Sequence, residues 1–354
     1  MSGADETRSL AEQLRQHFGH RDHLYGVMLA AMADDLEAGG VTAEILADHL
    51  DAPREQVVQL RLLAGIFRIV LRGDAPQLVP YYPSLGGDAD TADAWAVVRD
   101  VMASHVDELV RALDLPPQTN EVGRSACLLA GLFEVVRRRG LHRVRLLEPG
   151  ASAGLNLLVD RFRFSGPGWA WGPSHSPLHL DTDAVLEPVH LEVVERRGCD
   201  LAPIDASTDD GAHLLTSYVW PFDVERHARL AAALELVRRH PVTVDPAPAS
   251  QWLADRLAEP VPADVVTVVW HSITRQYWPQ DEVDAVDRLV EEGRDRMPLS
   301  HVSMEGTPPT LAPGGYDVAL HGPEVSVDGD VIARAHHHGL PLVLMPGGGR
   351  PPSP

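Results

Sequence analysis

Hydrophobic residues recur at helical spacing through roughly the first 140 residues of the chain. The first stripe of apolar positions comprises Leu10, Leu14, Tyr25, Met28, Leu29, Met32 and Leu36. Similar stripes follow Asp51, cover residues 91–113 and continue through residues 127–136. Glycines or prolines interrupt the pattern between them, as is typical of helix ends. The pattern predicts an all-helical N-terminal domain over residues 1–140.

From residue 141 the pattern changes to short apolar runs that alternate with amphipathic stretches. The apolar runs, which predict strands, lie at residues 144–147, 190–194, 242–244, 265–270 and 299–304. The intervening stretches predict helices at residues 224–239, 251–257 and 282–292. Such alternation is typical of an α/β fold, a doubly wound, mostly parallel sheet with helices on both faces.

Three further segments complete the predicted organisation. Residues 163–188 are rich in Gly, Pro, Ser and Trp and predict an insertion with short strands of its own. Residues 316–320, a turn at Asp328-Gly329 and residues 340–345 predict a closing antiparallel pair. The α/β domain is expected to cover residues 141–346, and residues 347–354 are expected to form a disordered tail.

The charge of the chain excludes several classes of function. Its 354 residues carry a net charge of -21, and all 30 basic residues are arginines because the chain contains no lysine. A Schiff base to pyridoxal phosphate and a Walker-type phosphate lysine are therefore impossible. The acidity also argues against a nucleic-acid partner, since such binding needs clustered cations.

Other features suggest a cytoplasmic protein. Cys127 and Cys199 are the only cysteines, and the residues around them lack metal-ligand spacing. We therefore expect no disulfide framework and no metal site. No signal-peptide pattern opens the chain, and no apolar run is long enough to span a bilayer, so no membrane partner is expected.

The stretch around residues 144–162 concentrates the candidate chemistry. An apolar run ends at Glu148, a turn of Gly, Ala and Ser follows, and Leu155, Leu158, Val159 and Phe162 then recur at helical spacing. This pattern predicts a strand, a tight turn and a helix, the unit in which α/β proteins hold small ligands at strand carboxyl ends. Gly150 and Gly154 lack a Cβ atom and would allow a close approach.

One interpretation of the turn is a nucleophile elbow. Residues 150–154 fit G-x-S-x-G, with Ser152 as the nucleophile. The candidate partners are Asp245 or Asp264 and His271 or one of His336, His337 and His338. The long helical segment upstream argues against this hydrolase, because no earlier strand supplies an oxyanion loop. A dinucleotide fingerprint fits less well, since its middle glycine is missing and no acid stands about 20 residues after the turn.

The same turn resembles the E-x-G-x-x-x-G first motif of S-adenosylmethionine-dependent methyltransferases, which have a Rossmann-like fold. The resemblance implies a cofactor site at Glu148, Gly150, Ala151, Ser152, Gly154 and Asn156. It further places Asp200 at the ribose hydroxyls, Asp245 beside the adenine and residues 268–272 near the transferred methyl group. Asp200 lies 50 residues after Gly150, more than is usual, and the insertion would have to account for the excess.

The whole layout also resembles an uncharacterised bacterial family of the domain-of-unknown-function type, DUF2332-like. The stretches that carry this resemblance are Gln118 to Arg124 (Gln-Thr-Asn-Glu-x-x-Arg) and Gly150 to Asn156 (Gly-Ala-Ser-Ala-Gly-Leu-Asn). The resemblance supports the architecture and supplies no known activity.

These observations together predict methyl transfer from S-adenosylmethionine to a small or medium-sized substrate bound between the two halves. A carboxylate at the strand end complements the sulfonium and ammonium of the cofactor, and an in-line displacement needs positioning and at most one base. The candidate catalytic residues are His271, Tyr277 and Glu121. The alternatives are the serine hydrolase and a non-catalytic ligand-binding module of the same fold. The substrate and the oligomeric state stay open.

Several of these residues also have a purely structural interpretation. Residues 119–121 could cap the helix that follows, and His271 could be a satisfied structural histidine. Glu305 could line the pocket or orient a loop. The run His336–His338 is not expected to bind metal, because adjacent strand residues point to opposite faces. Residues 137–139, all arginines, are expected to form a solvated helix end.

Overall fold

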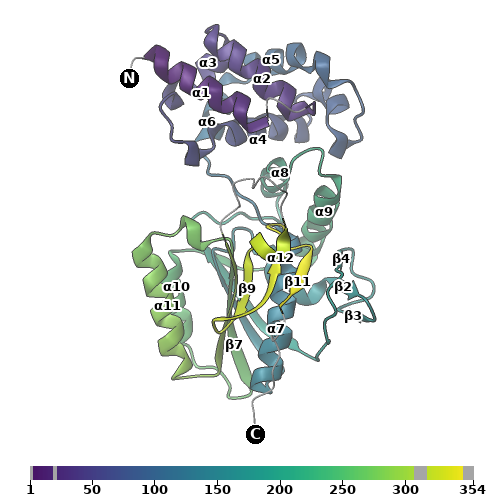
Figure 1. Ribbon diagram of the computed structural model, residues 1–354, viewed down its shortest axis with the longest axis vertical. Coiled ribbons are helices and arrows are strands. Elements are labelled where there is room, and N and C mark those ends of the chain that lie inside the picture. Colours follow the sequence, from purple (N-terminus) through teal and green to yellow (C-terminus); the bar gives the residue numbers. More distant parts are fainter. Residues whose placement is uncertain (1–2, 19–21, 307–316, 346–354) are drawn as a thin grey trace. The chain divides into compact units, whose positions relative to one another are not determined.

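The computed structural model describes residues 3–18, 22–306 and 317–345. The chain divides into two compact units (Figure 1), the first comprising residues 1–119 and 208–228, the second residues 120–207 and 229–354. This division differs from the predicted boundary at residue 140, because α7 (Ser125–Arg139) belongs to the second unit. Most of α7 is buried, and a Cβ atom on its Gly131 would lie 2.3 Å from Cγ1 of Val302, so α7 packs directly on the sheet. The tail predicted over residues 347–354 lies outside the described residues.

The first unit is built from helices. They are α1 (Gly3–Phe18), α2 (Leu24–Glu37), α3 (Val41–Ile45), α4 (Val58–Leu71), α5 (Ala94–Ser104), α6 (Val106–Leu113) and, from the later segment, α8 (Asp209–Ser217). Short 3-10 turns lie at Ala47–His49, Arg54–Gln56, Pro76–Tyr81, Pro83–Leu85 and Thr91–Asp93. The core includes the stacked rings of Phe67 and Tyr82, whose centroids are 4.5 Å apart. The single helix predicted over residues 91–113 is interrupted at His105.

The second unit contains a mixed sheet of eight strands. In chain order they are β1 (Arg143–Pro149), β5 (Glu192–Asp200), β6 (Val244–Pro246), β7 (Val265–Ser272), β8 (Leu299–Glu305), β9 (Glu324–Val327), β10 (Asp330–Ala335) and β11 (Leu342–Leu344). Their order in the sheet is β11-β10-β9-β8-β7-β1-β5-β6. Five neighbouring strands, β8, β7, β1, β5 and β6, pair in parallel. The other three, β9, β10 and β11, are added to β8 by antiparallel pairing. The prediction of a large, mostly parallel sheet is confirmed, as are the turn at Asp328-Gly329 and an antiparallel strand within residues 340–345. The part of the closing pair predicted at residues 316–320 is wrong where it is described, because Val318–His321 forms a helix.

The strand order reverses between β1 and β7. From β1 the chain adds β5 and β6 on one side and then returns to add β7 and β8 on the other. In open α/β sheets, ligands bind outside the carboxyl ends of the strands at such a reversal, because the connecting loops diverge there. The carboxyl ends of β1 and β7 carry Glu148 and His271.

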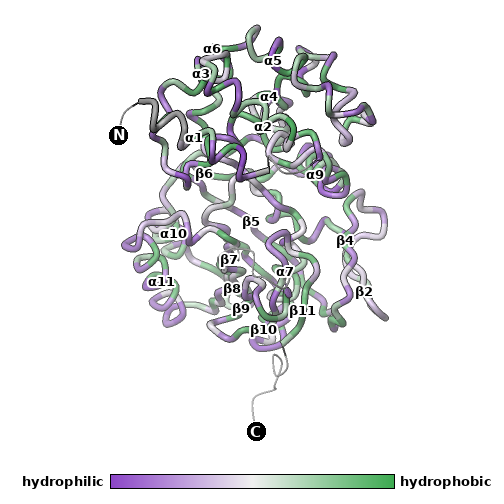
Figure 2. The backbone as a smooth tube through the Cα atoms, turned by 45° about the horizontal axis from the view of Figure 1, so that its top comes forward, coloured by the Kyte–Doolittle hydropathy of each residue, from purple (hydrophilic) through white to green (hydrophobic). Residues whose placement is uncertain are grey.

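Helices cover both faces of this sheet (Figure 1). On one face, α10 (Ala249–Ala258) and α11 (Gln280–Arg294) bury an apolar cluster with Leu147, Val269 and Leu299, whereas α7 lies against the other face. The tube of α11 alternates between hydrophilic and hydrophobic colours, as expected for a helix buried on one side (Figure 2). Strand side chains alternate between faces, so Glu148 points to the α7 face and His271 to the α11 face. The remaining helices are α9 (Val224–Arg239), which contains a boundary between the units, and α12 (Val318–His321).

The segment after β1 departs from the predicted strand, turn and helix. A 3-10 segment, Leu155–Arg161, replaces the expected α-helix and is kinked at Leu158. Residues 155–159 are all buried, so this stretch has no solvated face. A three-stranded sheet follows, formed by β2 (Arg163–Gly166), β3 (Trp169–Trp171) and β4 (His179–Asp181). The predicted insertion with short strands is therefore present, and it explains the long separation between Gly150 and Asp200.

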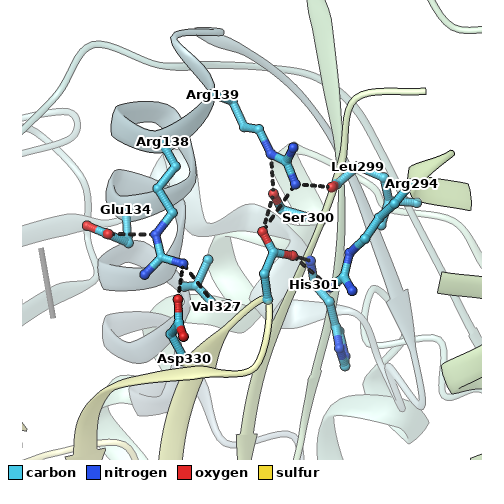
Figure 3. A network of polar contacts seen from close by, with 10 residues as sticks. Glu134, Arg138, Arg139, Arg294, Leu299, Ser300, His301, Val327 and Asp330 are labelled. Atoms are coloured by element: carbon cyan, nitrogen blue, oxygen red, sulfur yellow. Dashed lines mark hydrogen bonds and ion pairs between the residues drawn. The ribbon is translucent and has the colours of Figure 1, made fainter. Parts of the chain in front are cut away.

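Arginines at helix ends fix the β9–β10 turn (Figure 3). Asp328 accepts from Arg294 (2.8 Å), from Arg139 (3.2 Å) and from the backbone N–H of His301 (2.9 Å). Arg138 binds Glu134 (2.7 Å) and Asp330 (2.8 Å). All three arginines at residues 137–139 are exposed, as predicted for a solvated helix end, and Arg138 and Arg139 also pair with the residues of this turn. A one-dimensional pattern could not reveal the strand turn that lies beside them.

None of the helices among the described residues combines the length and apolarity that a membrane crossing requires.

Candidate functional site

The turn after β1 is fixed to the end of β5. The backbone N–H groups of Gly150 and Ala151 donate to the carbonyl of Cys199 at 2.8 and 2.9 Å. The N–H of Ser152 donates to Oδ2 of Asp200 at 2.9 Å, and Oδ1 of Asp200 accepts from the N–H of Ala202 at 3.0 Å. Residue 152 has a φ of +54°, a left-handed conformation that a serine adopts at a cost. The Asp200 carboxylate thus stabilises the strained turn.

The two glycines of the turn lie against the protein itself. Gly150 has a φ of +74°, and a Cβ atom there would lie 2.3 Å from Cγ2 of Thr274. Gly154 has a φ of +71°, and its Cβ atom would lie 2.8 Å from Cγ2 of Val244. Backbone conformation and packing against the segments around β7 and β6 therefore both require glycine. Other groups do approach the backbone closely at both glycines, as predicted from the sequence, but these groups are the side chains of Thr274 and Val244.

Glu148 is a buried carboxyl group at the reversal of strand order. Its Oε1 accepts from Nε1 of Trp270 on β7 at 3.1 Å. Burial raises its pKa to about 8, although Trp270, Asn156 and Arg124 act in the opposite direction. Within the described residues, no group donates to the buried Oε2 with normal hydrogen-bond geometry. A cationic group beside Glu148 would favour its ionised form.

The two sequence motifs that carry the family resemblance bind each other. The N–H of Leu155 donates to Oδ1 of Asn120 at 2.7 Å, and Oγ of Ser125, the residue directly after the first motif, donates to Oδ1 of Asn156 at 2.6 Å. Glu121 caps the short turn Val122–Arg124 by accepting from the N–H of Gly123 at 3.1 Å. The capping interpretation thus holds for Glu121.

Glu121 also pairs with the turn that follows β10. Its Oε2 lies 3.3 Å from Nδ1 of His338, and Glu121 is buried. His336, His337 and His338 lie in this turn and not on a strand, and the N–H of His338 donates to Nδ1 of His336 at 3.2 Å. Burial, reinforced by His336, lowers the pKa of His337 to about 4. No cluster with metal-ligand character occurs in the part of the chain that the structure describes.

Arg124, the last residue of the motif Gln118 to Arg124, is a further residue of this site. Its Nε donates to the carbonyl of His337 at 2.9 Å and its Nη1 to the carbonyl of Ser272 at 3.2 Å. Burial lowers its pKa, whereas Glu121 and Glu305 favour its charged form. Arg124 thereby places a positive charge among the carboxyl groups of Glu121, Glu148 and Glu305. Its fixed place in the motif Gln118 to Arg124 was the available signal.

His271 is fully buried, and both of its ring nitrogens have partners. Nδ1 lies 2.7 Å from Oε1 of Glu305, and Nε2 lies 2.8 Å from Nε2 of His301. Burial, with a further contribution from His271, lowers the pKa of His301 well below its ordinary value. One of the two facing Nε2 atoms must carry the shared hydrogen. His271 therefore connects Glu305 to His301 and has no nitrogen left for a substrate.

Glu305 is the partly exposed end of this chain of hydrogen bonds. Its Oε1 accepts from His271 and from the N–H groups of Thr274 (3.1 Å) and Arg275 (3.5 Å). The side chain is 21% exposed, and no described group is bonded to Oε2. Tyr277, also predicted as catalytic, is 76% exposed in the segment after β7. Of the residues near His271, Glu305 is thus a carboxylate that a ligand can reach.

Asp245 has most of its acceptor capacity occupied. Both of its oxygens lie 3.0 Å from Nη2 of Arg197, and Oδ2 also accepts from Nε1 of Trp252 at 2.7 Å. Burial works to raise its pKa, but the bonds from Trp252 and Arg197 outweigh burial and lower it. These contacts fix the end of β6 beside the turn that follows β1.

The partners proposed for a Ser152 nucleophile are engaged elsewhere. His271 contacts Glu305 and His301, Asp245 pairs with Arg197, and Asp264 pairs with Arg143 at 2.7 Å.

A serine, a histidine and an aspartate do meet in the small sheet, at Ser165, His179 and Asp181. There the aspartate lies 3.3 Å from Nε2 of His179, the nitrogen that also faces the serine. A catalytic triad requires the aspartate at Nδ1, so this group lacks triad geometry.

The model of the family described as "Uncharacterized protein conserved in bacteria (DUF2332)" matches residues 8–343. The chain belongs to this family. The match covers both units, so the DUF2332 region includes the helical unit as well as the sheet. No curated protein and no solved structure matches the chain.

Proposed function

We propose that this DUF2332 protein is an S-adenosylmethionine-dependent methyltransferase of Rossmann-like fold that acts on a small or medium-sized substrate. The observation that carries the proposal is the buried Glu148 carboxyl, whose Oε2 receives no hydrogen bond of normal geometry from the described residues, although the nearby Asn156 side chain favours its ionised form. A buried polar atom without a partner is costly, and a bound cation that also donates hydrogen bonds would remove that cost. S-adenosylmethionine would supply an activated methyl group on a sulfonium and, in its ammonium, such a donor.

The position of Glu148 supports the same proposal. It stands at the reversal of strand order, where ligands of open α/β sheets bind. Gly150, Ala151, Ser152, Gly154 and Asn156 form the turn beside it, which is tied to Asp200. A carboxylate has about four acceptor positions, and Asp200 uses one on each oxygen within the protein. The remaining positions suit ribose hydroxyls, whereas Asp245 has less capacity left and, in this proposal, shapes the end of β6.

The catalytic roles follow from which groups a substrate can contact. Glu305 presents Oε2 at the carboxyl end of β8, while Oε1 is held by three donors. We propose that Glu305 accepts the hydrogen bond, or the proton, of the methyl acceptor. His271 is then a positioning residue that orients Glu305, Glu121 holds the Arg124 turn in place, and Tyr277 provides an exposed aromatic surface. Catalysis by positioning with one base is adequate for an in-line displacement.

The proposal is tested by calorimetric titration with S-adenosylhomocysteine, the demethylated cofactor, between pH 6 and 9. In the protein without ligand, Glu148 is mostly protonated below pH 8, because its pKa is about 8. Binding of the ligand ammonium favours the ionised form, so at pH 7 binding should release close to one proton per site. Affinity should therefore rise with pH and level off above about pH 8. Proton release is measured by comparing buffers of different ionisation enthalpy.

The matched control is Glu148→Gln, which keeps the shape and removes the titrating group. It should bind more weakly and without the pH dependence. Absence of both heat and thermal shift in the wild-type protein at millimolar ligand would contradict the proposal, since a ligand of the folded state must stabilise it. Binding without any turnover on candidate acceptors would instead support the non-catalytic module.

A further inference from the structure

Three arginines lie in a row along α4 in the helical unit. Arg61, Arg68 and Arg72 are seven and four residues apart, which places them along one side of the helix. Gly65 lies on the same side, and a Cβ atom there would be 3.0 Å from Cβ of Ala112 on α6. The row therefore runs along the contact between α4 and α6.

Two of these arginines have acceptors supplied by the protein. Nη1 of Arg61 donates to the carbonyl of Leu113 at 2.7 Å, at the end of α6. Arg72 pairs with Glu108 (2.6 Å) and with Asp74 (3.0 Å). The guanidinium groups of Arg61 and Arg72 are thus each bound by oxygen acceptors on or next to α4 and α6.

Arg68 differs from both neighbours. It makes no hydrogen bond or ion pair with any described residue, and its Nε atom is buried. Glu108 acts on Arg68 only through its field, because its contact is with Arg72. Tyr218, which follows α8, lies near enough for Arg68 and Arg61 to counteract the upward shift of the tyrosine pKa that burial causes. Arg68 is thus a half-buried cation beside a second cation and a phenol.

This arrangement is unfavourable without an external acceptor. Burial lowers the pKa of Arg68, which is the signature of a charged form that has lost hydration. A guanidinium left without partners forfeits hydrogen bonds worth more than those of neutral groups. An unbranched apolar side chain would suit the position better if packing were its only role.

We propose that Arg68, with Arg61 and Tyr218 beside it, binds a small oxyanion, a phosphate or carboxylate group of a ligand. The planar fork of a guanidinium matches two oxygens of either group. The Tyr218 hydroxyl donates to the carbonyl of Pro116 at 3.5 Å, so it would add a third donor only by exchanging this long bond for one to the anion. The site lies in the helical unit and is independent of the methyltransferase proposal.

Inorganic phosphate and acetate, titrated separately by calorimetry in a weakly coordinating buffer, test the site. Arg68→Met should weaken binding of the preferred anion at least tenfold. Arg111→Met removes the same charge from an exposed position on α6 and should leave binding unchanged. The anion that binds more tightly identifies the ligand group as phosphate or carboxylate. No saturable binding to the wild-type protein, or an equal loss in both variants, would overturn the proposal.

Thermal unfolding without anion separates a binding residue from a structural one. Arg68→Met should melt at the wild-type temperature or above it, because it removes a poorly compensated charge. Phosphate or acetate should then raise the melting temperature of the wild-type protein and not that of Arg68→Met. A clear drop in the melting temperature of ligand-free Arg68→Met would assign the guanidinium a structural role and refute the site.

Discussion

At the scale of single residues, neighbours decide the chemistry more than residue type does. Glu148 and Glu305 both end strands of the same sheet, yet one is buried with a pKa of about 8 and the other is partly exposed. His271 was a candidate base in the sequence, but its two nitrogens are bound to Glu305 and His301. The motif around the turn predicted where the polar groups gather. It could not predict which of them are occupied by protein partners, because that depends on contacts such as the one between His271 on β7 and His301 on β8.

The hydrolase alternative leads to a prediction for Ser152. We expect a fluorophosphonate probe to leave this serine unlabelled, because a serine hydroxyl reacts only when a base activates it. Ser152 is buried, and the aspartates and the histidine His271 proposed as its partners are engaged elsewhere. Mass spectrometry of the labelled protein checks this outcome. Stoichiometric labelling that disappears in Ser152→Ala would restore the hydrolase interpretation.

At the scale of elements, ion pairs at helix ends hold the sheet in register. Asp328 accepts from two arginines on different helices and from the backbone of β8. We expect Asp328→Asn to lower the free energy of unfolding by about 1–3 kcal/mol, since it leaves charged donors without their partner. Urea denaturation measures the loss.

Asp330→Asn is the matched control for this turn. Asp330 is 74% exposed and, among the described residues, pairs only with Arg138, so its loss should cost well under about 1 kcal/mol, as is usual for surface pairs. Equal effects of the two substitutions would contradict the role given to Asp328.

The elements themselves were largely predictable, and the exceptions have physical causes. The buried strand Val265–Ser272 and the helix Val224–Arg239 follow directly from periodicity. The α-helix expected after Gly154 is replaced by a 3-10 segment. Residues 155–159 are all buried, so the apolar spacing that predicted an α-helix reflects burial on every side and not one buried helix face. The sequence also could not assign α7 to the sheet unit. Its pattern is that of any buried helix, and contacts in three dimensions, such as that of Gly131 with Val302, are needed to identify its partner.

At the scale of the whole molecule, buried titratable groups determine how stability responds to pH. Burial lowers the pKa of His17, His227, His301 and His337. The unfolded chain therefore binds protons before the folded one does as pH falls below about 6.5, and stability decreases. Glu148 acts in the opposite sense. Its raised pKa makes the folded protein bind a proton more tightly, so its contribution is lost as pH rises from about 4.5 to about 8.

These opposing groups predict a stability maximum near pH 6.5. On the acid side four histidines outweigh one carboxyl, so the urea midpoint should fall as pH decreases toward 5. Between pH 6.5 and 8 the wild-type midpoint should fall slowly because of Glu148, whereas Glu148→Gln should be flat there and fall more steeply in acid. Urea titrations at pH 5, 6, 7 and 8 on both proteins measure the difference. Parallel curves would show that Glu148 titrates at its ordinary pKa, which would remove the basis for linking it to a cationic ligand.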